Sequence, residues 1–285
     1  MTLLASDLPA RQLARDEIRK LIDSFETGQQ RDLDAILRIL ADARARLVAQ
    51  LAQGSEFDVS RAQGMIASID REVQRLRYEL APVVSRSFRD SMALGDADAL
   101  TKAQAVLPDG LHLSTGVSTQ LVQVANQRSA SLVAQISEVA RAQLNSLMLR
   151  SATGTSRPAD VARAIGDVIG PEDRPVGVFG TLATQIERIH RTETSSLYAV
   201  ADEVRTKRVA VESPYQMLKQ WIAVLDFRTR ASHRAMNGVT VPVGDPFILD
   251  GVECSGPHDS ILPAEDAVFC RCSTGLVRGE RKPGR

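Results

Sequence analysis

The sequence predicts an α+β protein, with a long-helix N-terminal region followed by a small mixed α+β domain that contains a short sheet. Residues 1–150 are rich in Ala, Leu, Arg, Gln and Glu and poor in Pro and Gly, which is the composition of helices. Prolines and glycines then gather in residues 151–180, which is typical of a linker. Most aromatic side chains follow, so we place the mixed domain at 181–277 and a basic tail at 278–285.

Apolar side chains recur every three or four residues along three N-terminal segments, as on the buried face of a helix. The first segment ends at residues 54–55, and the second stops before Pro82 or continues with a kink to Leu94. A connection within residues 95–110 precedes the third, which begins at Ser114. We expect three long antiparallel helices whose apolar faces pack together.

The second half contains one more helix and then segments with strand character. A helical pattern runs from Thr181 to about Val211 and ends before Pro214. Residues 216–225 fit either a helix or a strand, whereas 239–241 and 269–277 are rich in β-forming residues. These segments predict a small sheet.

Charge and cysteine content exclude several classes of protein. The 35 basic and 35 acidic residues balance, so no bulk attraction to nucleic acid or to an anionic membrane is expected. The N-terminus lacks the pattern of a secretory signal, and no apolar run is long enough to span a membrane. We therefore expect a soluble protein of the cytosol. Its three cysteines are an odd number and do not suggest a disulfide framework.

Hydrogen-bonding side chains are concentrated in residues 225–236, LDFRTRASHRAM. Asp226 precedes Arg228 and Arg230, an arrangement that favours charge-assisted pairs. A turn of helix over 228–236, capped by Asp226 and closed at 237–238, would place these groups on one side together with His233.

A second cluster of reactive side chains lies near the C-terminus. Cys270 and Cys272 flank one residue in a predicted strand, so both thiols would face the same side. Together with Cys254 they offer sulfur ligands for tetrahedral zinc, and His233 or His258 offers the nitrogen. Buried free thiols or a redox-sensitive pair are the alternatives, because Cys-x-Cys is less typical of zinc sites than Cys-x-x-Cys.

Two further hypotheses for the function are an enzyme and a DNA-binding protein. Asp226, His233, Glu193 and Arg191 are suited to a metal-dependent nuclease or hydrolase, and Cys270 with His233 could form a nucleophile and base. No HExxH, phosphate loop or GxSxG motif supports catalysis, so we expect no enzyme. Weak phosphate contact could come from the basic residues of the tail, and a solvated tail is the alternative. Those residues are Arg278, Arg281, Lys282 and Arg285.

The order and spacing of several motifs in residues 180–277 resemble the phage Mu F-like minor head proteins, also called head morphogenesis proteins. The motifs are Arg191-Thr192-Glu193, then Trp221, Asp226, Arg228-Thr229-Arg230 and His233, then Gly238, Phe247, Pro263-Ala264 and Cys270-Arg271-Cys272. Phe269 stands where such proteins commonly have Asn, and Cys254 lies outside the pattern.

The resemblance implies a structural component of the virion head of a tailed phage or prophage, assembled in the host cytoplasm. Its implied partners are the portal protein and capsid proteins, with roles in head assembly and in DNA packaging or delivery. The helical region would then be the part that docks on the portal or shell. The resemblance also implies that the shared motifs form a structural polar core, made of Arg191, Glu193, Trp221, Asp226, Arg228, Thr229, Arg230 and His233.

Overall fold

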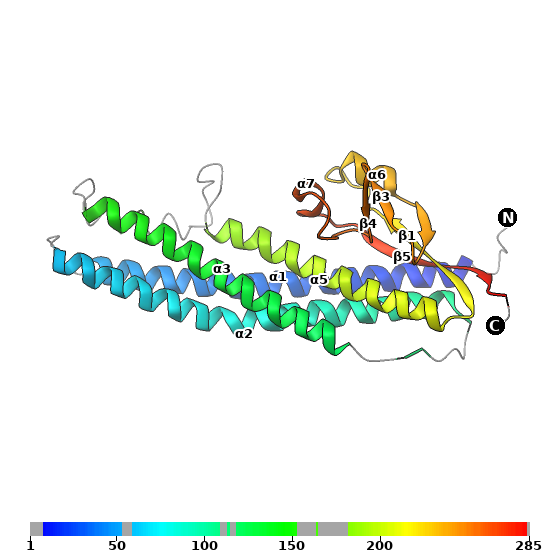
Figure 1. Ribbon diagram of the computed structural model, residues 1–285, viewed down its shortest axis with the longest axis horizontal. Coiled ribbons are helices and arrows are strands. Elements are labelled where there is room, and N and C mark those ends of the chain that lie inside the picture. The colour runs from blue at the N-terminus through cyan, green and yellow to red at the C-terminus, as the bar shows by residue number, and fades with distance from the viewer. Residues whose placement is uncertain are drawn as a thin grey trace. The chain divides into compact units, whose positions relative to one another are not determined.

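The computed structural model describes residues 8–52, 59–108, 113–114, 118–152, 164 and 182–283. Four long helices come first, and short strands and helices follow (Figure 1), which confirms the predicted α+β class. The predicted linker at 151–180 lies almost entirely outside the described residues. The long helices are α1 (Leu8–Ala52), α2 (Val59–Val106), α3 (Thr119–Ala152) and α5 (Leu182–Glu212). No helix in the described part of the chain is long and apolar enough to span a membrane.

The chain divides into two compact units, each built from separate stretches of sequence. Residues 30–87 and 126–190 form one unit, here called the helical unit. Residues 1–29, 88–125 and 191–285 form the other, here called the sheet-containing unit. Each unit takes residues from both sides of segment 151–180, so the compact units are not the sequence segments 1–150 and 181–277.

The helical unit is held together by the apolar faces of its helices. The buried side chains of α1 recur at helical spacing, and those of α2 and α3 do the same. The buried positions have the spacing that the sequence predicts for apolar helix faces. They include Leu33, Ile36, Leu40 and Leu47 of α1, Ile69, Val73, Leu76 and Leu80 of α2, and Leu132, Ile136 and Leu144 of α3.

The second helix is much longer than predicted. The sequence predicted either a stop before Pro82 or a kinked continuation to Leu94, with a connection from Gly95, but α2 runs through both residues to Val106. Pro82 is exposed, as is Tyr78 one turn earlier, so solvent can reach the turn in which proline removes a hydrogen bond. Burial of Val84 and Phe88 then continues the apolar face, which favours the helix.

The sheet-containing unit carries a three-stranded antiparallel sheet in the order β2-β1-β5. Its strands are β1 (Tyr215–Ile222), β2 (Thr240–Pro242) and β5 (Ser273–Arg281), so residues 216–222 adopt the strand alternative. A separate hairpin pairs β3 (Phe247–Leu249) with β4 (Val252–Cys254). The short helices are α6 (Ala231–Met236) and α7 (Ala264–Ala267).

Two apolar clusters stabilise this unit. One packs β1 and β5 against α2 and α5 through Met217, Leu276, Ala103 and Val209. The other surrounds Trp221, whose side chain is fully buried, and combines Phe247, Leu262 and all three cysteines. This second cluster positions the candidate site.

Candidate functional site

His233, Cys270 and Cys272 come together where β1 and β5 leave the sheet. The last paired residues are Ile222 and Ser273, and Cys272 directly precedes this pair. The chain after β1 turns through residues 223–230 into α6, which carries His233. The cysteines were predicted to lie in a strand, but β5 begins only at Ser273, so both lie in the preceding loop.

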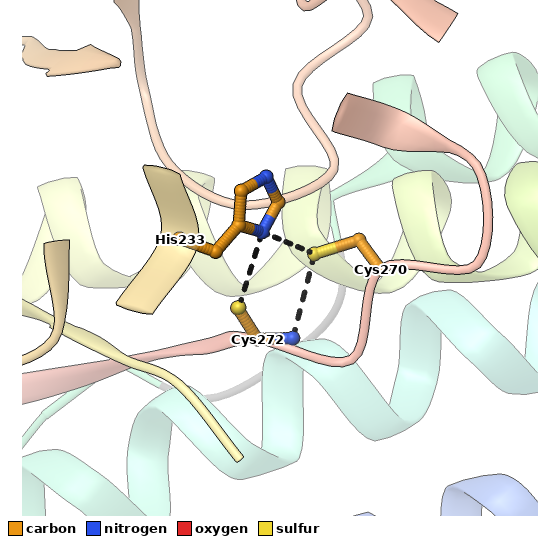
Figure 2. Close-up of side chains that lie close together, drawn as sticks. All are labelled: His233, Cys270 and Cys272. Carbon is orange, nitrogen blue, oxygen red and sulfur yellow. Dashed lines mark hydrogen bonds between the residues drawn. The ribbon is translucent and has the colours of Figure 1, made fainter. Parts of the chain in front are cut away.

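The three side chains point toward one another (Figure 2). Nδ1 of His233 is 3.5 Å from Sγ of Cys270 and 3.4 Å from Sγ of Cys272. The backbone N–H of Cys272 donates to Sγ of Cys270 at 3.4 Å. All three potential ligand atoms lie within 4.8 Å of one another, and all three residues are buried.

Packing around His233 fixes its ring. Trp221 meets the ring edge-on, with centroids 5.6 Å apart and an angle of 84°. Phe247 packs edge-on against the ring of Trp221, with centroids 5.5 Å apart. Beyond the cluster, Nε2 of His233 lies 3.3 Å from Oδ1 of Asp266, which is itself buried. One ring nitrogen therefore faces the thiols and the other faces a carboxylate.

The two thiols of the cluster differ in acidity. A hydrogen bond from Cys270 lowers the pKa of Cys272, and nearby His233 acts in the same direction, although burial opposes both. The same hydrogen bond and burial raise the pKa of Cys270. Cys272 is therefore the group of the pair that more readily becomes a thiolate, the form that attacks electrophiles and binds metals.

Cys254 does not join this group, although the sequence placed it among the candidate metal ligands. Its thiol is buried in β4, and its ligand atom is not among those that gather at His233. Burial raises the pKa of Cys254 to about 11, so it remains protonated at neutral pH. His258 is the other candidate for the nitrogen ligand. Its Nε2 lies 3.1 Å from the carbonyl oxygen of Cys272.

Asp226 pins the loop before α6 with one of its two predicted partners, Arg228, and with an arginine that was not predicted, Arg271. Its carboxylate accepts a hydrogen bond from the guanidinium of Arg271, between the two cysteines, and one from the backbone N–H of Arg228 at 2.9 Å. Arg228 is only a loose ion-pair partner at 3.6 Å, and Arg230 instead donates to the carbonyl of Val268. The bond from Arg271 lowers the pKa of Asp226 to about 2.

The expected cap of this helix is also different. The helix spans Ala231–Met236 with Arg230 at the N-cap, and no side chain caps it. Asp226 instead closes the preceding turn, where the hydroxyl of Thr229 contacts its Oδ1 at 3.3 Å. The C-terminal stop is as expected, because Gly238 follows with a positive φ of 88°.

The remaining motif residues lie elsewhere. Arg191 of α5 donates to Oε1 of Gln29 in α1 at 3.1 Å, and Gln29 in turn donates to Thr194 at 2.6 Å. Glu193 is on the same helix and is not among the ligand atoms gathered at His233. The contacts of Arg191 and Thr194 with Gln29 tie α5 to α1 within the sheet-containing unit.

The basic tail is partly a strand. Strand β5 continues to Arg281, and Arg278 lies over the ring of Tyr215 at 5.1 Å. Nζ of Lys282 donates to the carbonyls of Ala210 and Ser213 at the end of α5. Arg285 lies outside the described residues. Contact of these basic residues with DNA stays a prediction.

One buried charged network was missed from the sequence. Lys102 of α2 makes ion pairs with Asp98 and, at 2.8 Å, with Asp202 of α5. Thr274 of β5 donates to Asp202 at 2.7 Å, and the hydroxyl of Tyr198 donates to Asp98. Burial opposes the charge on Lys102, but the two carboxylates outweigh it and raise the lysine's pKa. The i,i+4 spacing of an acid and a lysine was the signal that could have revealed part of it.

A cavity of about 120 Å³ adjoins both the charged network and the cysteine cluster. Its lining includes Lys102, Asp202, Lys219, His258, Cys270 and Cys272. Burial lowers the pKa of His258 to about 4, so this histidine is neutral at neutral pH.

Together these features place a buried histidine–thiol cluster and an arginine–carboxylate contact beside the three-stranded sheet of the sheet-containing unit. Residues 152–275 match the family model described as "Phage Mu protein F like protein". This segment of the chain is similar to the phage Mu F-like family, which confirms the resemblance seen in the sequence.

Other comparisons give a partial match and one negative result. The chain is 33% identical over 90 residues to NAD(+)–arginine ADP-ribosyltransferase EFV of Enterococcus faecalis. That match covers 32% of this chain and only 18% of the relative, so the chain spans less than a fifth of that protein. No solved structure matches the chain.

Proposed function

We propose that the protein is a minor head component of a tailed phage or prophage that acts in head morphogenesis and associates with the portal. The match of residues 152–275 to the phage Mu F-like family carries this proposal. The helical region would dock on the portal or on the capsid shell. A role in DNA packaging or delivery would follow from that location.

An exposed apolar loop supports an assembly role. Phe227 is 92% exposed, and Leu225 beside it is 48% exposed. Leu225 and the exposed Phe269 both adopt positive φ, at 62° and 55°, which is strained for such side chains. The Asp226–Arg271 bond links their two loops. Exposed apolar side chains held in strained loops are suited to contact with another head protein.

A transferase function is not favoured by the partial match to the Enterococcus faecalis protein. The match spans too little of that protein to transfer its activity to this chain. The histidine–thiol cluster is also buried, and His233 is only 1% exposed, so a bulky substrate would not reach it without opening the domain.

Quantitative mass spectrometry of purified particles tests the proposal. We expect a few copies of this chain for each portal ring, because a minor component occupies one vertex. Complete absence from particles despite normal expression would contradict a virion component.

A loop variant sharpens this experiment. Phe227→Ser should reduce incorporation into particles without changing the fold, because the side chain is almost fully exposed. Ile261→Ser is a matched control, since Ile261 is a 64% exposed apolar residue of another loop. Equal incorporation of both variants at the wild-type level would remove the loop from the proposed contact surface.

A further inference from the structure

We propose that His233, Cys270 and Cys272 bind one zinc ion that fastens the loop before β5 to α6. This inference does not depend on the head function, because it uses only the geometry of the cluster.

The spacing of the ligand atoms fits tetrahedral zinc. Zinc binds cysteine sulfur at about 2.3 Å and histidine nitrogen at about 2.0–2.1 Å, so a tetrahedral ion separates these two ligands by about 3.6 Å. Nδ1 of His233 is 3.5 Å from one sulfur and 3.4 Å from the other. An ion can therefore enter with only small movements of side chains already aimed at a common point (Figure 2).

The other nitrogen of His233 faces a carboxylate, the kind of group expected behind a metal-binding histidine, but makes no hydrogen bond that would already satisfy it. Histidines that bind zinc through one ring nitrogen usually direct the second toward a carboxylate or carbonyl, which fixes the ring and its tautomer. Nε2 of His233 lies 3.3 Å from Oδ1 of Asp266. Asp266 is thus placed to orient the ligand, so it is a positioning residue and not itself a ligand.

The charge of such a site suits its burial. Two thiolates balance the double positive charge of zinc, and a neutral imidazole adds none, so the loaded site has no net charge. Binding releases the proton of each cysteine that is still protonated. The N–H of Cys272 that donates to Sγ of Cys270 further stabilises a bound thiolate.

The fourth position is best filled by water. Among the described residues, no other His, Cys, Asp or Glu ligand atom joins the group. The cavity of about 120 Å³ is lined by both cysteines and by His258. Because one water needs a cavity volume of only about 10–15 Å³, this cavity can hold the water that would be the fourth ligand.

Metal analysis of the full chain tests the proposal. The chain, purified under reducing conditions, exposed to zinc and then desalted, should retain about one zinc per chain. Cys270→Ser and Cys272→Ser should each lower retention at least tenfold. Cys254→Ser is the matched control, because Cys254 is a buried cysteine that lies outside the group. It should keep the wild-type content.

Cobalt substitution keeps the test valid if a cysteine variant fails to fold. The wild-type chain, stripped with a chelator and titrated with Co²⁺, should show thiolate-to-cobalt absorption together with the visible bands of a tetrahedral ion. Asp266→Asn should preserve these bands and weaken metal affinity about 10–100-fold.

Three results would overturn the proposal. The first is a wild-type chain that binds neither zinc nor cobalt. The second is a disulfide between Cys270 and Cys272 in the protein isolated from the cytosol. The third is a loss of zinc from Cys254→Ser as large as that from Cys270→Ser.

Discussion

The helical unit and the strand-bearing part of the sheet-containing unit, residues 215–281, here called the domain around Trp221, are held together by different kinds of interaction. In the helical unit, apolar side chains recur at helical spacing along α1, α2 and α3 and bury one another. The domain around Trp221 has short strands of three to nine residues, and its core contains three cysteines and a buried histidine. A sheet this small buries little apolar surface, so specific contacts between side chains carry more of its stability. The two regions should therefore respond differently to mutation and to removal of the proposed zinc ion.

Core truncation should give the largest effects and should separate the regions. Trp221→Ala removes a fully buried side chain that packs on His233 and Phe247, and we expect a loss of ~3–5 kcal/mol in the free energy of unfolding. Hydrogen exchange should show that loss in residues 215–276. Leu40→Ala, of the helical unit, should cost ~2–5 kcal/mol and act on that unit instead. Identical exchange changes in both variants would contradict the separation.

Replacing Gly95 of α2 by alanine should have an intermediate effect on stability, and it should destabilise the protein although this change usually stabilises a helix. A Cβ at Gly95 would lie 2.1 Å from the carbonyl oxygen of Tyr198, which belongs to the backbone of α5. Gly95→Ala should therefore destabilise the protein by ~1–3 kcal/mol, as overpacked sites do. Gly64→Ala, in the same helix, meets no atom within 4 Å and should stabilise it by ~0.5–1 kcal/mol. Thermal denaturation measures both, and stabilisation by Gly95→Ala would disprove the close helix contact.

The smallest predicted effect is the contribution of Asp226 to the pH dependence of stability. Its pKa is about 2 in the folded protein and 3.8 for the free side chain, so the carboxylate stabilises the fold above pH 3.8 and loses that contribution as the pH falls toward 2. Asp226→Asn should be slightly less stable than wild type at neutral pH and equal to it near pH 2. Denaturation at a series of pH values measures this difference.

Arg271→Ala provides the comparison for that titration. Because the bond from Arg271 is the main cause of the lowered pKa, this variant should lose most of the same pH dependence. A dependence that survives in Arg271→Ala would mean that the backbone contacts of the turn, and not the arginine, set the acidity of Asp226.

The sequence predicted the helices better than their ends. Helical periodicity identified the core of the helical unit, because each of its positions depends on neighbours three or four residues away. Pro82 and Gly95 were interpreted as breaks, yet buried Phe88 and the contact at Tyr198 keep both in one helix. The local sequence does not show whether a glycine ends a helix or allows a second helix to pack closely against the first.

The candidate site could be predicted in part. The sequence identified His233, Cys270 and Cys272, and the structure brings these residues together. It did not identify the position of Asp266 beside His233, the pairing of Asp226 with Arg271, or the contact of Arg230 with the carbonyl of Val268. These contacts join residues more than thirty positions apart, and their partners depend on how the loops fold. Cys254 was included because of its chemistry alone.

Hydrogen exchange of the full zinc-loaded chain, before and after removal of zinc with a chelator, tests most directly whether the histidine–thiol cluster holds the small domain. We predict faster exchange in residues 231–236 and 268–276 after chelation, with no change in residues 64–87 and 126–146 of the helical unit. Unchanged exchange at the cluster, or an equal increase in both regions, would contradict this account.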